Sequence, residues 1–328
     1  MWKIKDITID SEVVLAPMAG VSFLAYRDFM KPFGVGLSVS EMVSDCGLIY
    51  NNQTTLEYIK TSNIDHPVAI QLFGNDAETI IKAIDICFKN NKDIDIIDIN
   101  LGCPVPKVTK AGSGSALLKD PKHLYEMMKL IVAHSPVPVT CKIRLGYYDD
   151  NLNFLENIKA LEDAGVSAIA LHTRSAKQLY SGVAHHELAK DLGLKMKVPL
   201  IISGDIFTLE DAINAKEITK ASAVMVARGG VGNPYLVKQI SHYFKTGEKL
   251  PKISLEENIK YMLQLVDMSI AQFGEIKAIM IMRGIVPKFF NGYPNTKQIK
   301  NEICQSITTK QSLVEILKKY NLIEDNNK

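Results

Sequence analysis

The sequence predicts an α/β fold in which strands and helices alternate, followed by a shorter all-helical region. Eight apolar runs of strand length lie between residues 13 and 227, and their starts are 24, 30, 28, 43, 30, 31 and 24 residues apart. Amphipathic segments separate most of these runs, whereas residues 254–322 show helical periodicity alone. This alternation is typical of βαβ units in a parallel sheet. Eight such units over about 230 residues match the size of a (β/α)₈ TIM barrel.

The eight predicted strands are short, apolar and rich in β-branched residues. They cover residues 13–17, 37–42, 67–73, 95–100, 138–144, 168–172, 199–203 and 223–227. A doubly wound open sheet is the alternative arrangement. The GxGxxG turn typical of the first strand in many such sheets does not follow residue 17, which favours the barrel.

Three of the intervening helices have recognisable ends. The helix expected over residues 76–91 begins after Asp76, whose side chain can cap the first helical amides. A second helix, expected over 120–134, has Pro121 in its first turn, where the missing N–H costs nothing. A third, expected over 151–165, ends at a glycine.

The charge changes after the last predicted strand. The net charge is −3 over residues 1–237 and +6 over residues 238–320. We therefore expect a catalytic barrel over 1–245, a small helical domain over 252–322 and a disordered tail over 323–328. A basic helical domain suits a polyanionic partner such as RNA, and a solvated lysine-rich surface is the plain alternative.

Composition excludes several classes of protein. No run reaches the roughly 18 apolar residues of a membrane span, and the first residues lack the apolar region of a signal peptide. The five cysteines contain no CxxC pair, which argues against a disulfide framework and a zinc site. We expect a cytoplasmic protein with no membrane partner and no metal, and a monomer as the default state.

Polar residues recur at the carboxyl ends of the predicted strands, where TIM barrels place their active sites. Lys142 shares a strand face with Thr140 and Arg144, so that face requires an anion. The last two strands end in the glycine-containing loops SGD and ARGGVGN, and these loops are the usual phosphate site of the fold. A phosphate on one side and a lysine on the other suit flavin mononucleotide (FMN).

Cys103 lies in a turn between Gly102 and Pro104, directly after the fourth predicted strand. Taken alone, it is either a small buried hydrophobic residue or a reactive thiol. The following segment, KAGSGSALL, lacks the GK[ST] ending of a phosphate-binding P-loop. We expect Ser113 or Ser115 to cap a helix there.

Nine motifs occur in the order seen in tRNA-dihydrouridine synthases, so the chain resembles that family over about residues 11–235. They are APMAGVS, SEM, QLFG, DINLGCPVPKV, GSALL, KIRLG, HTRS, SGDI and ARGGVGNP. The resemblance implies an FMN enzyme that reduces the C5–C6 double bond of chosen uridines in the tRNA D-loop. It also implies NADPH or NADH as the electron source.

The resemblance further implies roles for individual residues. The residues expected at the cofactor are Pro17, Met18, Ala19, Gln71, Lys142, His172, Ser203, Gly204, Asp205, Ala227, Arg228 and Gly229. The resemblance also places Asn100 and Arg174 near the substrate base and the flavin. From their positive charge, and not from the resemblance, we expect Lys107, Arg144, Arg283 and Lys288 to contact the tRNA. Many family members have asparagine and glycine where this chain has Ser203 and Ala227.

Cys103 matches the family's proton donor. A hydride from the reduced flavin goes to C6 of the uracil, and a proton must then reach C5. A free thiol, with a pKa of about 8.5, is still protonated at neutral pH and can release its proton. Cys103 is thus expected to act as an acid.

Three rival functions remain at this point. A small-molecule flavin enzyme of the dihydroorotate or dihydropyrimidine dehydrogenase kind would use the same barrel and the same hydride step. A barrel without catalysis that binds RNA would not need Cys103 together with Lys142. A barrel that acts on sugar phosphates without redox chemistry would explain the glycine loops alone.

Overall fold

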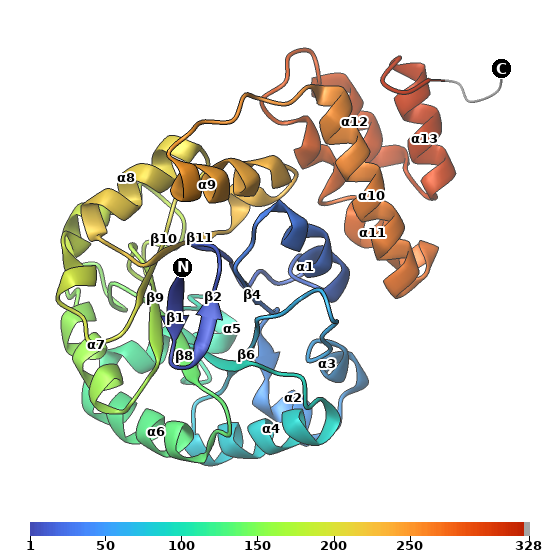
Figure 1. Ribbon diagram of the computed structural model, residues 1–328. Helices are drawn as coiled ribbons and strands as arrows, with labels where there is room; N and C mark the ends of the chain where they lie inside the picture. The colour runs from blue at the N-terminus through green and yellow to red at the C-terminus, as the bar shows by residue number, and fades with distance from the viewer. Residues whose placement is uncertain (325–328) are drawn as a thin grey trace.

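The computed structural model describes residues 1–324, and the predicted barrel is confirmed. Eight parallel strands close into a ring in the order β4-β3-β11-β10-β9-β8-β7-β6, and β4 pairs with β6 to complete it (Figure 1). All eight predicted strands are present. Their bounds are β3 (Val13–Leu15), β4 (Leu37–Val39), β6 (Val68–Phe73), β7 (Ile96–Asn100), β8 (Val139–Arg144), β9 (Ala168–His172), β10 (Leu200–Ser203) and β11 (Ala223–Val226). A two-residue strand, β5 (Val43–Ser44), extends the pairing at the end of β6.

Helices surround the ring and bury their apolar faces against it (Figure 1). They are α1 (Leu24–Met30), α2 (Asp45–Ile49), α3 (Gln53–Glu57), α4 (Ala77–Asn90), α5 (Pro106–Thr109), α6 (Pro121–His134), α7 (Phe154–Asp163), α8 (Leu209–Thr219) and α9 (Pro234–Thr246). The predicted helix ends hold. The Asp76 side chain accepts from the Thr79 amide, Pro121 opens α6, and Gly165 after α7 has a φ of +89°.

A hairpin of β1 (Trp2–Ile4) and β2 (Ile7–Ile9) lies across the ring, and the sequence analysis did not predict it (Figure 1). Trp2, Ile4 and Ile9 are buried against apolar side chains from the inner faces of the strands, including Leu37 and Ala223. The signal was available, because residues 2–9 alternate apolar and polar side chains as half-buried strands do. The hairpin closes the amino-terminal end of the barrel.

The inner face of the barrel changes from apolar to polar along the strands. On β7 the inward side chains run from Ile96 through Asp98 to Asn100, and on β9 two alanines precede His172. Successive strand residues alternate faces, so these polar groups share the interior of the barrel at its carboxyl end. The functional cavity is there.

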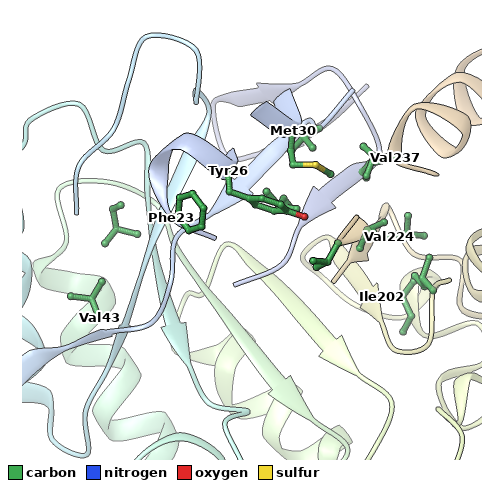
Figure 2. Packing of buried hydrophobic residues seen from close by; sticks show 14 of the residues in the cluster. Phe23, Tyr26, Met30, Val43, Ile202, Val224 and Val237 are labelled. Atoms are coloured by element: carbon green, nitrogen blue, oxygen red, sulfur yellow. The ribbon is translucent and has the colours of Figure 1, made fainter. Parts of the chain in front are cut away.

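Four helices and one 3₁₀ turn follow the barrel: α10 (Leu255–Phe273), α11 (Glu275–Met282), η6 (Val286–Phe290), α12 (Lys297–Ser306) and α13 (Lys310–Lys319). Helix α10 packs beside α1, where the rings of Phe23 and Phe273 lie 5.2 Å apart. Phe23, Tyr26 and Met30 belong to the same buried cluster as Val237 of α9 (Figure 2). The apolar packing continues from the barrel into these helices, so the domain limits near residue 251 stay a prediction.

Two other expectations concern the chain as a whole. Residues 325–328 of the predicted tail lie outside the described residues. Within the part of the chain that is described, no helix combines the length and apolarity needed to cross a membrane.

Candidate functional site

A cavity opens at the carboxyl ends of the strands, and residues predicted to bind the cofactor line it. Ten of the twelve are present: Pro17, Met18, Lys142, His172, Ser203, Gly204, Asp205, Ala227, Arg228 and Gly229. The other two lie elsewhere, because Ala19 is exposed outside the cavity and Gln71 is fully buried inside the barrel. Tyr180 and Phe207, which the sequence analysis did not single out, complete the rim.

Lys142 brings a positive charge to the cavity wall. The residue is half-buried, and its ammonium group makes no hydrogen bond within residues 1–324. Burial lowers the pKa of Lys142 to about 8, and the neighbouring Arg144 guanidinium acts in the same direction. Asp98 opposes this shift, since its carboxyl group lies on the adjacent strand and favours the charged lysine. An anionic ligand in the cavity would further stabilise the ammonium form.

His172 presents a neutral imidazole to the same cavity. Burial lowers its pKa well below the usual value, and the cationic side chains of Lys142, Arg144 and Arg174 reinforce the effect. Its Nε2 lies 3.4 Å from Nη1 of Arg174, which can only donate. Nε2 must therefore be the acceptor, and the remaining proton is assigned to Nδ1, which leaves the ring one donor.

Arg174 is engaged inside the protein, which departs from its expected contact with the substrate base. Its side chain is only 1% exposed and forms a two-pronged pair with Asp205, at 2.8 Å from Nη1 and 2.5 Å from Nη2. The carbonyl oxygens of Ser181 and Gly182 take further donors. The guanidinium thus joins the loop after β9 to the loop after β10 and orients His172.

The loops after β10 and β11 require glycine. A Cβ atom at Gly229 would lie 2.0 Å from the carbonyl oxygen of Ile206, and Gly204 has a φ of +126°. Arg228 is half-exposed at the rim, where it makes a long 3.3 Å contact with Asp205 and lies over the rings of Tyr180 and Phe207. It opens the 3₁₀ turn η5 (Arg228–Gly230), and first-turn amides have no partner within a helix. A phosphate group can therefore come close to the backbone N–H groups of these loops and to the Arg228 cation.

A buried chain of hydrogen bonds leads from the barrel interior to Cys103. Asp98 accepts from Thr140 at 2.6 Å and from Gln71 at 2.7 Å. The side-chain oxygen of Gln71 in turn accepts from the side-chain amide of Asn100 at 2.8 Å. The Asn100 Oδ1 atom accepts from the Cys103 backbone amide at 2.9 Å. Gln71 and Asn100 were expected at the flavin and at the substrate. The structure shows both positioning the turn that carries the thiol.

The serine-rich segment holds this turn from its other side. Ser115 donates through its hydroxyl and through its amide to the Cys103 carbonyl, at 2.9 and 3.1 Å. The expected helix capping is wrong: the Ser113 side chain caps no amide, and Ser115 is taken up by Cys103. Cys103 itself is half-buried, unlike the fully buried Cys87 and Cys141. The thiol sits on a rigid turn with access to solvent.

Cys103 lies in the turn that follows β7, and Lys142 lies on the neighbouring strand β8. Asn100 pairs with Lys142 in the β7–β8 register, and the Leu101 amide donates to the Lys142 carbonyl at 2.9 Å. The two side chains are close enough that a thiolate at Cys103 would favour the charged form of Lys142. It lies beside the cavity rather than among its lining residues.

The remaining predicted tRNA contacts are dispersed. Arg144 is 2% exposed and donates to the carbonyl oxygens of Gly102, Ser175 and Leu179, so it braces loops instead of presenting a free cation. Lys107 is exposed on α5, just beyond the Cys103 turn.

The other two predicted contacts lie in the helical region. Arg283 is half-buried and donates to the Ile307 carbonyl at 2.7 Å, and Lys288 is exposed on η6. No cluster of metal-ligating side chains occurs in the described part of the chain.

The fold and the cavity together define a TIM-barrel enzyme whose site combines a cation, a neutral imidazole and glycine-rich loops. A family model described as "Dihydrouridine synthase (Dus)" matches residues 14–324. The chain belongs to the dihydrouridine synthase family and is an oxidoreductase, which confirms the resemblance found in the sequence.

Individual relatives agree over nearly the whole chain. A probable tRNA-dihydrouridine synthase of Rickettsia bellii is 35% identical over 96% of this chain and 97% of its own length. A tRNA-dihydrouridine synthase B of Pseudomonas syringae pv. tomato is 33% identical over 91% and 88%.

Solved structures are similar in fold only. An NCR variant from Zymomonas mobilis is 15% identical with a TM-score of 0.52, over 76% of this chain and 91% of that one. Histamine dehydrogenase from Rhizobium sp. 4-9 is 12% identical with a TM-score of 0.54, over 81% of this chain and 50% of that one.

Proposed function

We propose that this enzyme reduces specific D-loop uridines of tRNA to 5,6-dihydrouridine, with FMN as cofactor and NADPH or NADH as electron source. Relatives named tRNA-dihydrouridine synthases match it over nearly its full length, which supports tRNA as the substrate. The observation that carries the proposal is the placement of the rigid Cys103 turn beside Lys142, next to the glycine-lined cavity. A monomeric, cytoplasmic enzyme completes the proposal.

The residues that line the cavity fit FMN. Gly204, Gly229 and Arg228 would hold the phosphate, since the loops exclude side chains and supply a cation. Lys142 and the Nδ1–H of His172 would face the polar edge of the ring. When bound, the reduced flavin supplies the hydride that reaches C6 of the uracil.

Cys103 supplies the proton. As charge develops at C5 of the uracil, the thiol S–H bond breaks, a C5–H bond forms, and a thiolate remains that water reprotonates. The Cys103 backbone amide donates to Asn100 and its carbonyl accepts from Ser115, and these two bonds hold the turn that carries the thiol. Such preorganisation contributes to catalysis because the acid need not be reoriented during the reaction.

The tRNA must present an extruded base, which costs a few kcal/mol of unstacking. Phosphate contacts offset this cost, and the exposed Lys107 and Lys288, with the half-buried Arg283, are the cations we assign to them. Arg144 and Arg174 contribute by bracing the loops around the site.

The direct test is to incubate the purified protein, FMN and NADPH or NADH with tRNA that lacks dihydrouridine, and then to digest the tRNA and weigh its nucleosides. A gain of two hydrogens on a D-loop uridine establishes the activity and its position. A yellow protein that oxidises NADPH yet leaves every uridine unchanged would point to the small-molecule flavin enzyme instead.

The charge of Lys142 predicts a pH dependence for FMN binding. The pKa of Lys142 is lowered to about 8, so its ammonium form predominates at pH 7 and is lost as the pH rises through that value. A charged hydrogen bond is worth about 1.5–3 kcal/mol. FMN affinity should therefore fall at least tenfold between about pH 7 and pH 9.5, a range in which the phosphate charge is constant because its second pKa is about 6.

Titration of the apoprotein with FMN at several pH values, followed by flavin fluorescence, measures this change in FMN affinity. Lys142→Arg keeps its charge throughout and should give a nearly flat profile, whereas Lys142→Met should be weak and flat. An equally steep fall in Lys142→Arg would assign the pH dependence to another group.

A further inference from the structure

A second cavity of about 210 Å³ lies between the barrel and the helices that follow it. Its wall on the barrel side includes Gly20, Ser22 and Glu41, and its opposite wall is formed by residues of α10 and α11. A single water needs only about 10–15 Å³, so the space admits a much larger group. The proposed flavin function leaves this cavity unused.

The two cavities share one loop as a wall. Met18 lines the flavin cavity, and Gly20, two residues further along, lines the second one. A tRNA strand that places one base against the bound flavin can therefore place a neighbouring nucleotide at the second cavity, because both cavities border this loop.

Aromatic side chains form the apolar walls of the second cavity. The rings of Phe23 and Phe273 meet edge to face at 5.2 Å, and Tyr58 lies on α3's side of the space. The Lys277 ammonium lies 4.7 Å from the centre of the Phe273 ring. Flat bases of single-stranded RNA stack on such side chains, and a nearby cation suits the attached phosphate.

Glu41 provides an acceptor at the bottom of the cavity. It is 6% exposed, and its Oε2 accepts from the Gly20 amide at 2.6 Å. No hydrogen bond reaches its Oε1 from any described residue. Burial raises the pKa of Glu41, and the Gly20 N–H and the Arg27 charge offset this only in part. Because Glu41 lines the cavity, its Oε1 is available to accept a hydrogen bond from a ligand there.

Two possible hydrogen-bond donors, Gln272 and Tyr58, line the same cavity as the Glu41 acceptor. Gln272 accepts from the Ala25 amide at 2.8 Å through its Oε1, which turns its amide nitrogen toward other partners. Neither that nitrogen nor the Tyr58 hydroxyl has a hydrogen bond in the part of the chain that is described. Arg27 is not available, because Asp65 and two backbone carbonyls take its donors.

We propose that this cavity binds a guanine of the tRNA D-loop, with the guanine N1–H and amino group donating to Glu41 and its O6 accepting from Gln272 or Lys277. Guanine is the RNA base that presents two adjacent N–H donors beside an acceptor, which is the complement of this set. The inference rests on tRNA being the substrate. It adds a base-specific contact that would help select which uridine is reduced.

Glu41→Gln tests the contact with little change of shape. The glutamine oxygen can still accept from the Gly20 amide, but its NH₂ group faces the guanine donors. We expect the affinity for tRNA to fall about 10- to 100-fold, the equivalent of one charged hydrogen bond. Glu78→Gln is the matched control: Glu78 lies on α4 outside this cavity, is 74% exposed and is paired with Lys82 at 2.6 Å, so the affinity of this variant should change less than twofold.

Synthetic tRNAs in which each D-loop guanine is replaced in turn by inosine, which lacks the amino group, provide the second arm. One replacement should weaken binding to the unaltered enzyme about tenfold and have no further effect on Glu41→Gln. The experiment with the unaltered enzyme tests the guanine site even if the Glu41→Gln variant fails to fold.

The guanine site is overturned if the unaltered enzyme binds every inosine-substituted tRNA as tightly as the unsubstituted tRNA. A Glu41→Gln variant that binds tRNA normally but accepts electrons from NADPH more slowly would overturn it too, in favour of a nicotinamide site. Absence of dihydrouridine formation by the unaltered enzyme would contradict the proposed function itself, a separate result.

Discussion

Replacing Cys103 with alanine is expected to lower the rate of dihydrouridine formation about 10²- to 10⁴-fold, the usual contribution of a positioned acid. The variant keeps the turn, because Asn100 and Ser115 bond its backbone amide and carbonyl rather than its sulfur. Only the proton donor is removed. A single turnover with prereduced enzyme, followed by mass analysis of the nucleosides, isolates this step from the reduction of the flavin.

Two further variants make the result specific to this thiol. Cys304→Ala removes an exposed cysteine in the helical region and should react at the normal rate. Flavin content in Cys103→Ala should be normal, because Cys103 does not line the flavin cavity. Dihydrouridine formation within threefold of the unaltered enzyme would assign the proton to another group.

Replacing Asp205 with asparagine is expected to lower the free energy of unfolding by about 3–5 kcal/mol, because it leaves the Arg174 guanidinium buried without its counter-charge. Asparagine is the suitable substitute, since residue 205 has a φ of +45° and asparagine tolerates that region. Urea unfolding of the cofactor-free protein measures the effect. His172 should also lose its fixed orientation, which would weaken FMN binding.

The double variant Arg174→Met, Asp205→Asn tests the mechanism. It removes both charges, so it should be more stable than Asp205→Asn alone. Lys159→Met breaks an exposed pair with Asp163 and should change stability far less than Asp205→Asn does. If the double variant is the less stable one, the loss in Asp205→Asn does not come from the buried charge.

The same pair has a pH signature. Burial alone would raise the pKa of Asp205, but hydrogen bonds from Arg174 and from the Ala184 amide hold it below its usual value. A carboxyl group with a lowered pKa in the folded state stabilises the protein above its unfolded pKa, and this contribution is lost as the pH falls through the folded pKa. The difference in stability between the unaltered protein and Asp205→Asn should therefore shrink in acid.

The barrel was predictable because its strands are continuous apolar runs that end in polar residues. The apolar character of these runs is also the reason that the sequence analysis did not single out Asp98. It stands inside the run DIIDIN, and only the alternation of Ile97 and Ile99 with Asp98 and Asn100 marks two faces. A search for polar residues on the inner face would have found it.

The roles of Arg144 and Arg174 were beyond such reasoning. Both donate to backbone carbonyls on other loops, up to 42 residues away in the chain, and Arg174 also donates to the Asp205 carboxylate. A carbonyl oxygen leaves no mark in the sequence, so two buried arginines look like two free cations at a strand end. The positions of the two arginines in the barrel follow from the local sequence pattern, whereas their hydrogen-bond partners follow only from the completed fold.

The hairpin at the amino-terminal end has a consequence for how the chain is made. Trp2, Ile4 and Ile9 pack against strands as late as β11, and β3 itself pairs with β11 through Leu15 and Val226. A ribosome that adds about 5–20 residues per second needs on the order of ten seconds or more to synthesise the intervening 200 or so residues. During translation the first apolar segments therefore wait, without their final partners, for the last strand to emerge.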